Sequence, residues 1–263
     1  MLDFIKAHAY GNDFLFVTRE QVRDTDVSEL ARRLCDRHTG IGADGLIVYQ
    51  MTADGASMRL RNADGSRAEV SGNGVRCLAA IVAERQPHLR AQRIVIGTDS
   101  GDKVLTLQGQ EGERVVFRAA MGPPTSVRET TLDVLGAPLN VVALWVGNPQ
   151  CVVLGSLDDA RFRRLGPVLE HHPAFPDGTN VEFAQVEAPD RLGILIWERG
   201  VGPTQASGTG ACAAAVAAAA FAGASRDVQV VSPGGTQRVE WRSDGLYLTG
   251  WAEITVTGEW RPS

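Results

Sequence analysis

The sequence offers little that would tie the protein to nucleic acid or a membrane. Lys and Arg number 26 against 31 Asp and Glu, so the net charge is −5 and no excess of cations is present to neutralise phosphates. The longest apolar run, residues 211–222, is too short to span a bilayer. The first residues lack the charged and apolar regions of a signal peptide. We therefore expect a cytoplasmic protein with neither nucleic-acid nor membrane partners.

Cysteine is also scarce. Cys35, Cys77, Cys151 and Cys212 are widely spaced and form no CxxC pair, which argues against a zinc site and a disulfide framework. We expect reduced, mostly buried thiols and no metal. The phrase G-I-G-A-D-G at residues 40–45 matches a dinucleotide-binding pattern, but a helix-like stretch precedes it and a strand follows. This order is the reverse of the required one, so we expect a tight turn and no nucleotide.

What the sequence does contain is an internal repeat. E-V-S-G-N-G-V-R-C at residues 69–77 resembles Q-A-S-G-T-G-A-C at residues 205–212. Ser71 and Ser207 are 136 positions apart (207 − 71), and so are Asn12 and Asn148 (148 − 12), each of which follows a glycine. Two unrelated phrases in one register, at about half the chain length, predict two homologous halves. We place the halves at residues 1–118, completed by a strand at about 251–263, and at residues 119–250, with Gly-Pro-Pro near the junction.

Each half is rich in short strands and has one helix directly after its Ser-Gly phrase. The second of these helices is apolar all round, which predicts burial on every side. We expect an α/β (α+β) fold with two pseudo-symmetric domains, each a curved mixed sheet or barrel around a central helix. A further helix near residues 27–38 is amphipathic and peripheral, with Ser28 as its expected cap. The clearest strand patterns lie at residues 14–17, 46–49, 93–96, 103–107, 114–117, 139–146, 151–154, 193–197, 228–231, 238–241, 246–249 and 253–256.

A Ser-Gly-polar-Gly turn at a helix start suits a small anion. Glycine lets a ligand approach the backbone, and the free N–H groups of the first turn favour a carboxylate. Taken alone, Ser71 and Ser207 would be plain N-caps. Their repetition instead predicts two helix N-termini that face one cleft and hold two side chains on opposite faces of one α-carbon. Further polar groups in or beside turns could bind an ammonium and a second carboxylate, namely Asn62, Asn180, Glu198 and Arg199.

These phrases form an ordered series that closely resembles the diaminopimelate epimerase family over nearly the whole chain. The series comprises H-A-Y-G-N-D-F, R-H-T-G-I-G-A-D-G, R-N-A-D-G-S-R-A-E-V-S-G-N-G-V-R-C, G-N-P-Q-C-V, G-T-N-V-E-F, W-E-R-G-V-G-P-T-Q-A-S-G-T-G-A-C-A and S-P-G-G. The resemblance implies an isomerase that inverts an amino-acid α-carbon with two bases and no cofactor. For the family this reaction converts LL- to meso-diaminopimelate, in lysine and peptidoglycan synthesis. The resemblance also suggests a homodimer.

Motif by motif, the resemblance implies roles for individual residues. The two catalytic positions are Ser71 and Ser207, and the neighbouring Cys77 and Cys212 are other cysteines of the motifs. The α-carboxylate would be held by Gly72, Asn73, Gly208 and Thr209. The distal amino and carboxylate groups of the substrate would be bound by Asn12, Asn62, Asn148, Asn180, Glu198 and Arg199.

The chain departs from the family at these two positions. The family has cysteine at both, and it usually has His where this chain has Gln150. A thiol titrates near about 8.5 and lower at a helix N-terminus, whereas a serine hydroxyl is a far weaker acid. An unactivated serine pair should therefore lose many orders of magnitude in rate while still binding substrate.

Three explanations stay open at this point. The serines could be deliberate substitutions that silence a true epimerase. The chain could be a divergent isomerase that uses an acid such as Glu198, as the related phenazine-biosynthesis isomerases lack the cysteines. It could also be a non-catalytic amino-acid-binding protein.

Overall fold

A computed structural model describes residues 1–68, 71–91 and 93–261. The chain divides into two compact units, each described by itself below. Unit 1 comprises Met1–Ala119 and Gly250–Ser263, and unit 2 comprises Ala120–Thr249. The fold is mixed α+β, dominated by strands, with few helices.

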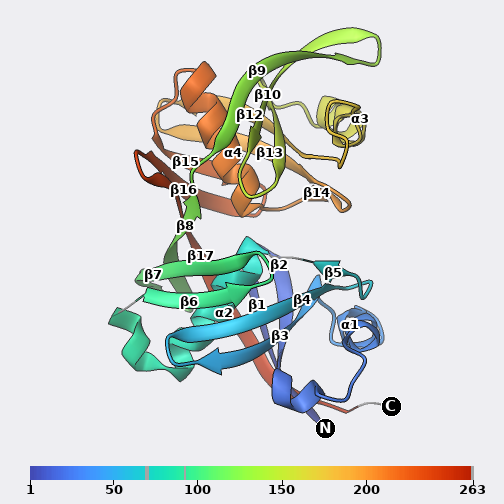
Figure 1. Ribbon diagram of the computed structural model, residues 1–263, viewed down its shortest axis with the longest axis vertical. Coiled ribbons are helices and arrows are strands. Elements are labelled where there is room, and N and C mark those ends of the chain that lie inside the picture. The colour runs from blue at the N-terminus through green and yellow to red at the C-terminus, as the bar shows by residue number, and fades with distance from the viewer. Residues whose placement is uncertain (69–70, 92, 262–263) are drawn as a thin grey trace. The chain divides into compact units, whose positions relative to one another are not determined.

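Unit 1 is a curved sheet whose strands follow the chain in a regular order (Figure 1). Its pairings are antiparallel except between β2 and β3 and between β4 and β6. The C-terminal part of β17 pairs with β1, so the end of the chain belongs to the sheet in which the chain begins. The elements are β1 (Leu2–Ala9), β2 (Asn12–Thr18), η1 (Arg19–Val22), α1 (Val27–Cys35), β3 (Gly45–Thr52), β4 (Gly55–Asn62), β5 (Arg67–Ala68), α2 (Gly72–Arg85), η2 (Pro87–Ala91), β6 (Arg93–Thr98), β7 (Gly101–Glu111), β8 (Arg114–Gly122) and β17 (Gly245–Trp260).

Unit 2 repeats this plan. Its parallel pairs, β11 with β12 and β13 with β15, fall at the corresponding places, and β9 pairs with β10 as β17 does with β1. The repeat expected from the spacing of Ser71 and Ser207 is therefore visible in the strand order. The elements are β9 (Thr125–Val134), β10 (Ala137–Trp145), β11 (Pro149–Leu154), α3 (Asp159–Glu170), β12 (Asn180–Ala188), β13 (Arg191–Glu198), β14 (Gly202–Thr204), α4 (Gly208–Phe221), β15 (Asp227–Ser232) and β16 (Gly235–Arg242), with the first part of β17.

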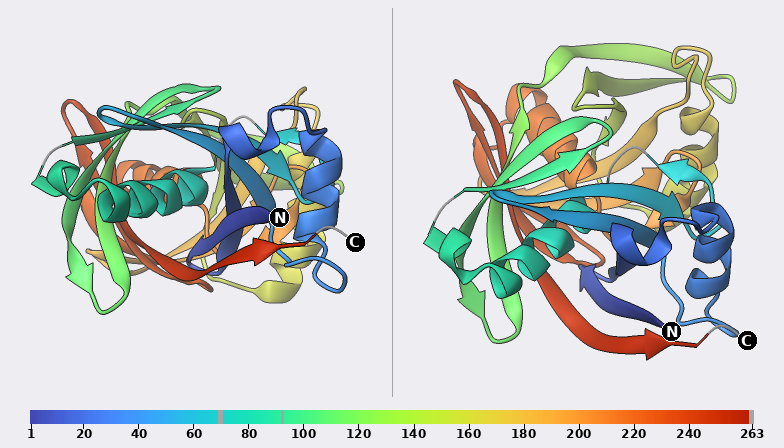
Figure 2. Two further views of the ribbon diagram at one scale, coloured as in Figure 1. Left: turned by 90° about the horizontal axis from the view of Figure 1, so that it is seen from below. Right: turned by 60° about the horizontal axis from the view of Figure 1, so that its bottom comes forward.

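Each unit surrounds one central helix of 14 residues, α2 or α4. In α2 every residue from Asn73 to Ala83 is buried, and Figure 2 shows this helix inside the strands of its unit. In α4 the residues from Gly210 to Ala218 are all buried among inward-facing aliphatic residues of the sheet. The alanine side chains explain this placement, because a helix with such a thin cross-section fits within a closely curved sheet. The predicted burial of this helix on every side is confirmed.

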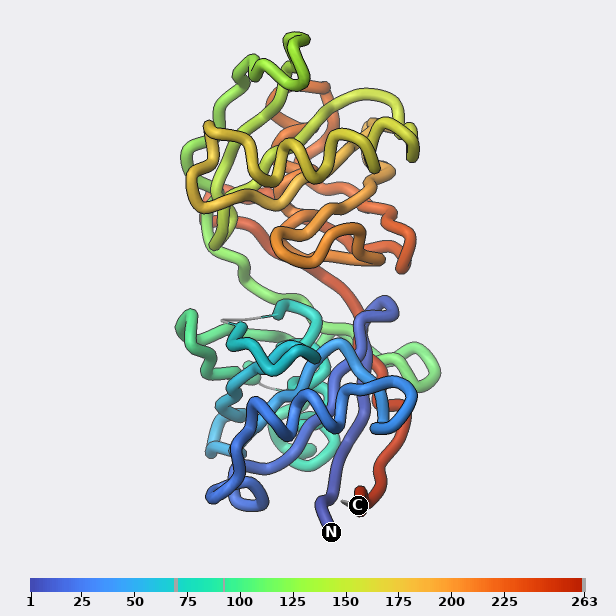
Figure 3. The backbone as a smooth tube through the Cα atoms, turned by 90° about the vertical axis from the view of Figure 1, so that its right-hand side faces the viewer, coloured from blue at the N-terminus to red at the C-terminus, as the bar shows by residue number. Residues whose placement is uncertain are grey.

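Each unit also has an outer helix, α1 in unit 1 and α3 in unit 2, and Figure 3 shows each on the outside of the sheet of its own unit. Helix α1 buries Leu30, Ala31, Leu34 and Cys35 and exposes its charged side, as its amphipathic pattern predicts. The expected cap was wrong by two positions. The side chain of Asp26, not Ser28, accepts hydrogen bonds from the backbone, and one donor is the N–H of Ser28 itself.

Eleven of the strand patterns predicted from β-branched and aromatic runs fall within observed strands, and the twelfth, residues 139–146, extends one residue beyond the end of β10 at Trp145. Six of the described strands lacked a recognised pattern. Charged or polar residues interrupt the apolar run in β1, β4, β9 and β12, and β5 and β14 are only two and three residues long. No helix in the described ranges is both long and apolar enough to cross a membrane.

Leu78 tests the importance of the central helix. It lies in α2 at 0% exposure, so Leu78→Ala should lower the free energy of unfolding by about 2–5 kcal/mol. Leu135→Ala is the matched control, because Leu135 is 65% exposed in the turn before β10 and should change stability by less than about 0.5 kcal/mol. Urea unfolding followed by circular dichroism measures both. Equal effects would contradict the central position of α2.

Candidate active site

The two serines occupy equivalent positions at the starts of the central helices. Ser71 is the N-cap of α2, and its Oγ accepts a hydrogen bond from the Gly74 N–H at 3.2 Å. Ser207 is the N-cap of α4, and its Oγ accepts from the Gly210 N–H at 3.2 Å. Neither helix has an acidic residue in its first turn. Each N-terminus therefore keeps its partial positive charge for an anion.

A side chain from the strand beneath each helix approaches the bare side of a glycine in the first turn, so a larger residue there would displace that side chain. A Cβ on Gly74 would stand 2.8 Å from Cδ1 of Ile47, and a Cβ on Gly210 would stand 2.7 Å from Oε1 of Glu182. Ile47 is on β3 and Glu182 is on β12, which are corresponding strands of the two units. The two serine-capped turns thus share a backbone but rest on different side chains.

In unit 1 a network of charged groups fixes Asn12. Its amide nitrogen donates to Asp44 at 2.7 Å, and its oxygen accepts from the Asn73 amide at 3.1 Å. Arg37 bridges Asp44 and Asp13 at 2.9 and 2.7 Å, and Lys6 pairs with Asp13 at 3.0 Å. Burial alone would raise the pKa of Asp13, but its bonds to Arg37 and Lys6 outweigh burial and lower it. The side chain of Asn12 is therefore held against the first turn of α2.

Asn73 and Asn62 lie beside this network. Asn73, 4% exposed, also accepts a hydrogen bond from the Arg76 guanidinium. Asn62 is exposed at the end of β4, opposite Gly45, and donates to the Ser66 hydroxyl at 3.0 Å. Three predicted residues of unit 1, Asn12, Asn73 and Ser71, thus gather at one end of α2.

In unit 2 several predicted residues are linked on neighbouring strands, and two lie at the start of α4. The amide of Gln150 donates to Asn148, and Gln150 stands opposite Asn180 in the parallel pair of β11 and β12. The side-chain oxygen of Asn180 accepts from the backbone N–H of Arg199 at 2.9 Å, which draws the turn after β13 to β12. Ser207 and Thr209 place their hydroxyl oxygens 3.4 Å apart.

The turn that carries Glu198 and Arg199 is held from below by Glu170. The carboxylate of Glu170 accepts from the Trp197 indole at 2.6 Å and from the Gly200 N–H at 2.7 Å. The guanidinium of Arg199 donates to the Asp177 carbonyl at 2.9 Å. These bonds fix the path of the turn and leave Arg199 exposed.

Glu182 is the most unusual titratable group of unit 2. Its side chain is fully buried, and neither carboxyl oxygen has a hydrogen-bond partner in the described part of the chain. Burial raises its pKa well above the ordinary value, and the nearby Glu198 carboxylate raises it further. Both effects favour the protonated form of Glu182 in the folded protein.

Several residues of these sites were not predicted. Asp13, Asp44 and Arg76 in unit 1 and Glu170 and Glu182 in unit 2 all hold or adjoin predicted residues. A signal existed for Glu182, because the spacing of two residues puts it on the same face of an extended strand as Asn180 and Ala184. We missed this signal because we interpreted T-N-V-E-F as a polar turn.

The neighbouring thiols are buried within the central helices. Cys77 and Cys212 are each 0% exposed, and burial raises the pKa of Cys77 to about 12. Among the described residues, no group of three or more His, Cys, Asp or Glu side chains is arranged to hold a metal ion.

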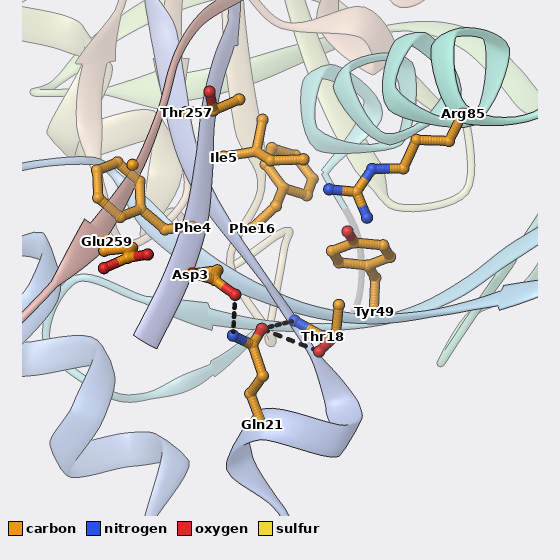
Figure 4. Close-up of a pocket in the computed structure, with 11 residues that line it drawn as sticks. Asp3, Phe4, Ile5, Phe16, Thr18, Gln21, Tyr49, Arg85, Thr257 and Glu259 are labelled. Atoms are coloured by element: carbon orange, nitrogen blue, oxygen red, sulfur yellow. Dashed lines mark hydrogen bonds between the residues drawn. The ribbon is translucent and has the colours of Figure 1, made fainter. Parts of the chain in front are cut away.

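A separate hollow of about 520 Å³ opens in unit 1 (Figure 4). Gln21 stands on one side, bonded to Asp3 at 3.3 Å and to the Thr18 hydroxyl at 2.9 Å, and Arg85 stands over the ring of Tyr49 on another. None of the predicted site residues lines this hollow, so it does not account for them.

Comparisons with known proteins agree with the fold and with the motifs. The family profile described as "Diaminopimelate epimerase" matches residues 4–127 and 142–255. The diaminopimelate epimerase of Desulforudis audaxviator is 41% identical, with 98% of this chain and 99% of that protein aligned. The diaminopimelate epimerase of Pelotomaculum thermopropionicum is 40% identical over the same shares.

Solved structures at low identity share the fold. A phenazine biosynthesis protein of Bacillus anthracis superposes with a TM-score of 0.73 at 14% identity, covering 99% of each chain. A hydroxyproline epimerase of Agrobacterium vitis superposes with a TM-score of 0.66 at 14% identity, covering 98% of this chain and 90% of that one.

The raised pKa of Glu182 predicts how stability depends on pH. Above its ordinary value of 4.5, the unfolded chain releases the Glu182 proton while the folded chain keeps it, so stability falls as pH rises. Glu182→Gln removes this pH-dependent loss of stability, because glutamine does not titrate. The free energy of unfolding of the variant, relative to that of the unaltered protein, should increase between pH 5 and pH 8 by up to about 1.4 kcal/mol per pH unit. Urea unfolding across this range measures the difference, and a constant difference would contradict a buried neutral acid.

The thiols of the native protein should be unreactive. Cys35, Cys77, Cys151 and Cys212 are all buried, and burial raises the pKa of Cys35 to about 12. A chromogenic disulfide at pH 7 should therefore label native protein at a rate set by unfolding, and label four thiols promptly after denaturation. A thiol that reacts within seconds in the native protein would show that one of these sites is open.

Proposed function

The chain belongs to the diaminopimelate epimerase family, and we propose that it is an isomerase that inverts the α-carbon of an amino acid. The proposed reaction is interconversion of LL- and meso-diaminopimelate without a cofactor. The groups that exchange protons with the α-carbon stand at Ser71 in one unit and Ser207 in the other. The observation that carries the proposal is the duplicated serine-capped turn, with the same hydrogen bond at the same length in both units.

The first turns of α2 and α4 suit the α-carboxylate of such a substrate. They comprise Gly72, Asn73, Gly208 and Thr209, and neither first turn contains an acidic residue, so the positive end of each helix dipole favours an anion. N–H groups that hold the carboxylate also stabilise the negative charge that spreads onto it when the α-proton leaves.

The polar residues around these turns suit the distal end of the substrate. Arg199 is exposed and can pair with a carboxylate, and Glu198 can pair with an ammonium group. Asn12, Asn62, Asn148 and Asn180 supply the remaining polar contacts. Because the networks described above fix Asn12 and Asn180, these side chains are ordered before the substrate arrives.

Serine limits the chemistry at both turns. A hydroxyl gives up its proton far less readily than a thiol, and each unit of pKa difference corresponds to about 1.4 kcal/mol. We therefore propose that this chain binds the amino acid but turns it over slowly. The same argument supports a second candidate, an amino-acid-binding protein that does not turn its ligand over.

Solvent-deuterium exchange at the substrate α-carbon tests the proposal. We expect slow exchange with the chain as it is, and acceleration of at least about 100-fold with Ser71→Cys and Ser207→Cys together, because a thiol is the better general acid and base. Each single variant should recover much less, since inversion needs both groups. Proton NMR in deuterium oxide measures the exchange.

The outcomes separate the two candidates. Exchange restored in the double variant supports the isomerase. A melting temperature raised by diaminopimelate, with no exchange in any variant, supports the binding protein. Neither exchange nor a shift in melting temperature would overturn both, and fast exchange by the unaltered chain would overturn the argument about serine.

A further inference from the structure

The carboxyl group of Glu182 lies against the serine-capped turn of unit 2. Its Oε1 would stand 2.7 Å from a Cβ on Gly210, and Cβ of Ser207 lies 3.3 Å from the same point. Glu182 and Ser207 thus both lie near the side of Gly210 that lacks a Cβ. The N–H of this glycine donates the hydrogen bond to the Ser207 oxygen. Helix α4 packs against β12 within unit 2, and Figure 1 shows the two elements side by side.

Unit 1 has no such group at the corresponding place. There a Cβ on Gly74 would meet Cδ1 of Ile47 at 2.8 Å, Cβ of Ser71 at 3.5 Å and the ring of Phe14 at 3.7 Å. Phe14 pairs in parallel with Gly45, two residues before Ile47, as Gln150 pairs with Asn180, two residues before Glu182. Phenylalanine and isoleucine in unit 1 are therefore replaced in unit 2 by an amide and a carboxyl group.

An unpaired carboxyl group in this position is costly for folding. A buried polar group without a hydrogen bond loses the solvation that it had in water, and a Leu or Ile at position 182 would avoid that loss. The side-chain oxygen of Gln150 on the adjacent strand also has no partner within the described ranges. Three buried oxygens without partners on two neighbouring strands, two of them on the carboxyl group beside Gly210, point to a role that outweighs their cost.

We propose that Glu182 is a positioning residue of the reaction, a proton-holding group that controls how readily the atom at position 207 carries negative charge. This role in turnover rests on the proposed function. When protonated, the Glu182 carboxyl group is a second, uncharged hydrogen-bond donor at this turn, beside the Gly210 N–H. When ionised, it opposes negative charge at position 207. The turn of unit 1, which rests on Ile47 and Phe14, has no counterpart to this control.

The titratable neighbours of Glu182 are few. Glu198 on β13 faces it and raises its pKa, and Cys151 on β11 feels its charge in turn. Helix α4 contributes no charged side chain, since its sequence is glycine, threonine, alanine, cysteine, valine and phenylalanine. Burial and, to a lesser degree, the Glu198 charge both favour the protonated form of Glu182.

Thiol reporters test this coupling without relying on turnover. Ser207→Cys places a titratable thiol beside Glu182, and Ser71→Cys places one at the equivalent turn of unit 1. Thiolate formation is followed by ultraviolet absorbance against pH, and the four native cysteines contribute equally to every variant. We combine each reporter with Glu182→Gln, which keeps a donor but removes the charge, and with Glu182→Leu, which removes both.

The proposal gives a specific order of results. In the Ser207→Cys background, Glu182→Gln should lower the pKa of the introduced thiol by about one unit, which is a tenfold rise in the thiolate-to-thiol ratio at a fixed pH. Glu182→Leu should give a smaller ratio than Glu182→Gln, because it offers no donor. In the Ser71→Cys background neither change should alter the ratio by as much as twofold. Glu187→Gln, an exposed carboxylate on the same strand, is the matched control and should have no effect.

Other outcomes would overturn the inference. A thiol at position 207 that titrates identically with glutamate, glutamine and leucine at position 182 would leave Glu182 a structural residue. Equal shifts at both reporters would show a change of the whole fold rather than a local coupling. Coupling at position 207 with no α-proton exchange in the double cysteine variant would instead support the proton-holding role and contradict the proposed isomerase.

Discussion

The absence of a Cβ at Gly74 and Gly210 is the constraint on which both candidate sites depend. Each glycine donates its N–H to the capping serine, and its bare side lets a strand side chain reach the first turn of the central helix. Any larger residue would push the helix away from the strand or displace the side chain beneath it. The cap, the free amides and the residue below them are therefore positioned by one small contact in each unit.

The two units use this shared backbone differently. In unit 1 the charged groups surround the turn from the side, where Lys6, Arg37, Asp13 and Asp44 fix Asn12, while the residues beneath are apolar. In unit 2 the polar group lies underneath, and neither oxygen of Glu182 has a hydrogen-bond partner among the described residues. The two units share the path of the chain and the capping bond, whereas the side chains around them differ.

The sequence predicted the parts of the fold that follow from short-range patterns. The shared spacing of Ser71 and Ser207 and of Asn12 and Asn148 predicted the repeat, and the alanine-rich stretch predicted a buried helix. Strands such as β12 were missed because their inward-facing positions include Asn180 and Glu182, which break the apolar alternation that marks a half-buried strand. Asp26 and Ser28 are both good capping residues, and only the observed backbone distinguishes them. Glu182 on β12 contacts the first turn of α4, which lies far from it in the sequence. Local sequence patterns do not reveal contacts between residues so far apart along the chain.

The difference between the turns bears directly on a reaction that removes a proton from one side of a carbon and returns one to the other. Such a reaction needs two groups that begin in opposite protonation states. Two identical turns, produced by duplication, would give both groups the same affinity for a proton. A helix N-terminus contributes a fixed partial charge in each unit, but only the turn at Ser207 rests on a carboxyl group whose own charge can change. Replacing an aliphatic side chain by Glu182 is therefore a minimal way to make two equivalent positions unequal, and its cost in stability falls on unit 2, the unit that gains the adjustable charge.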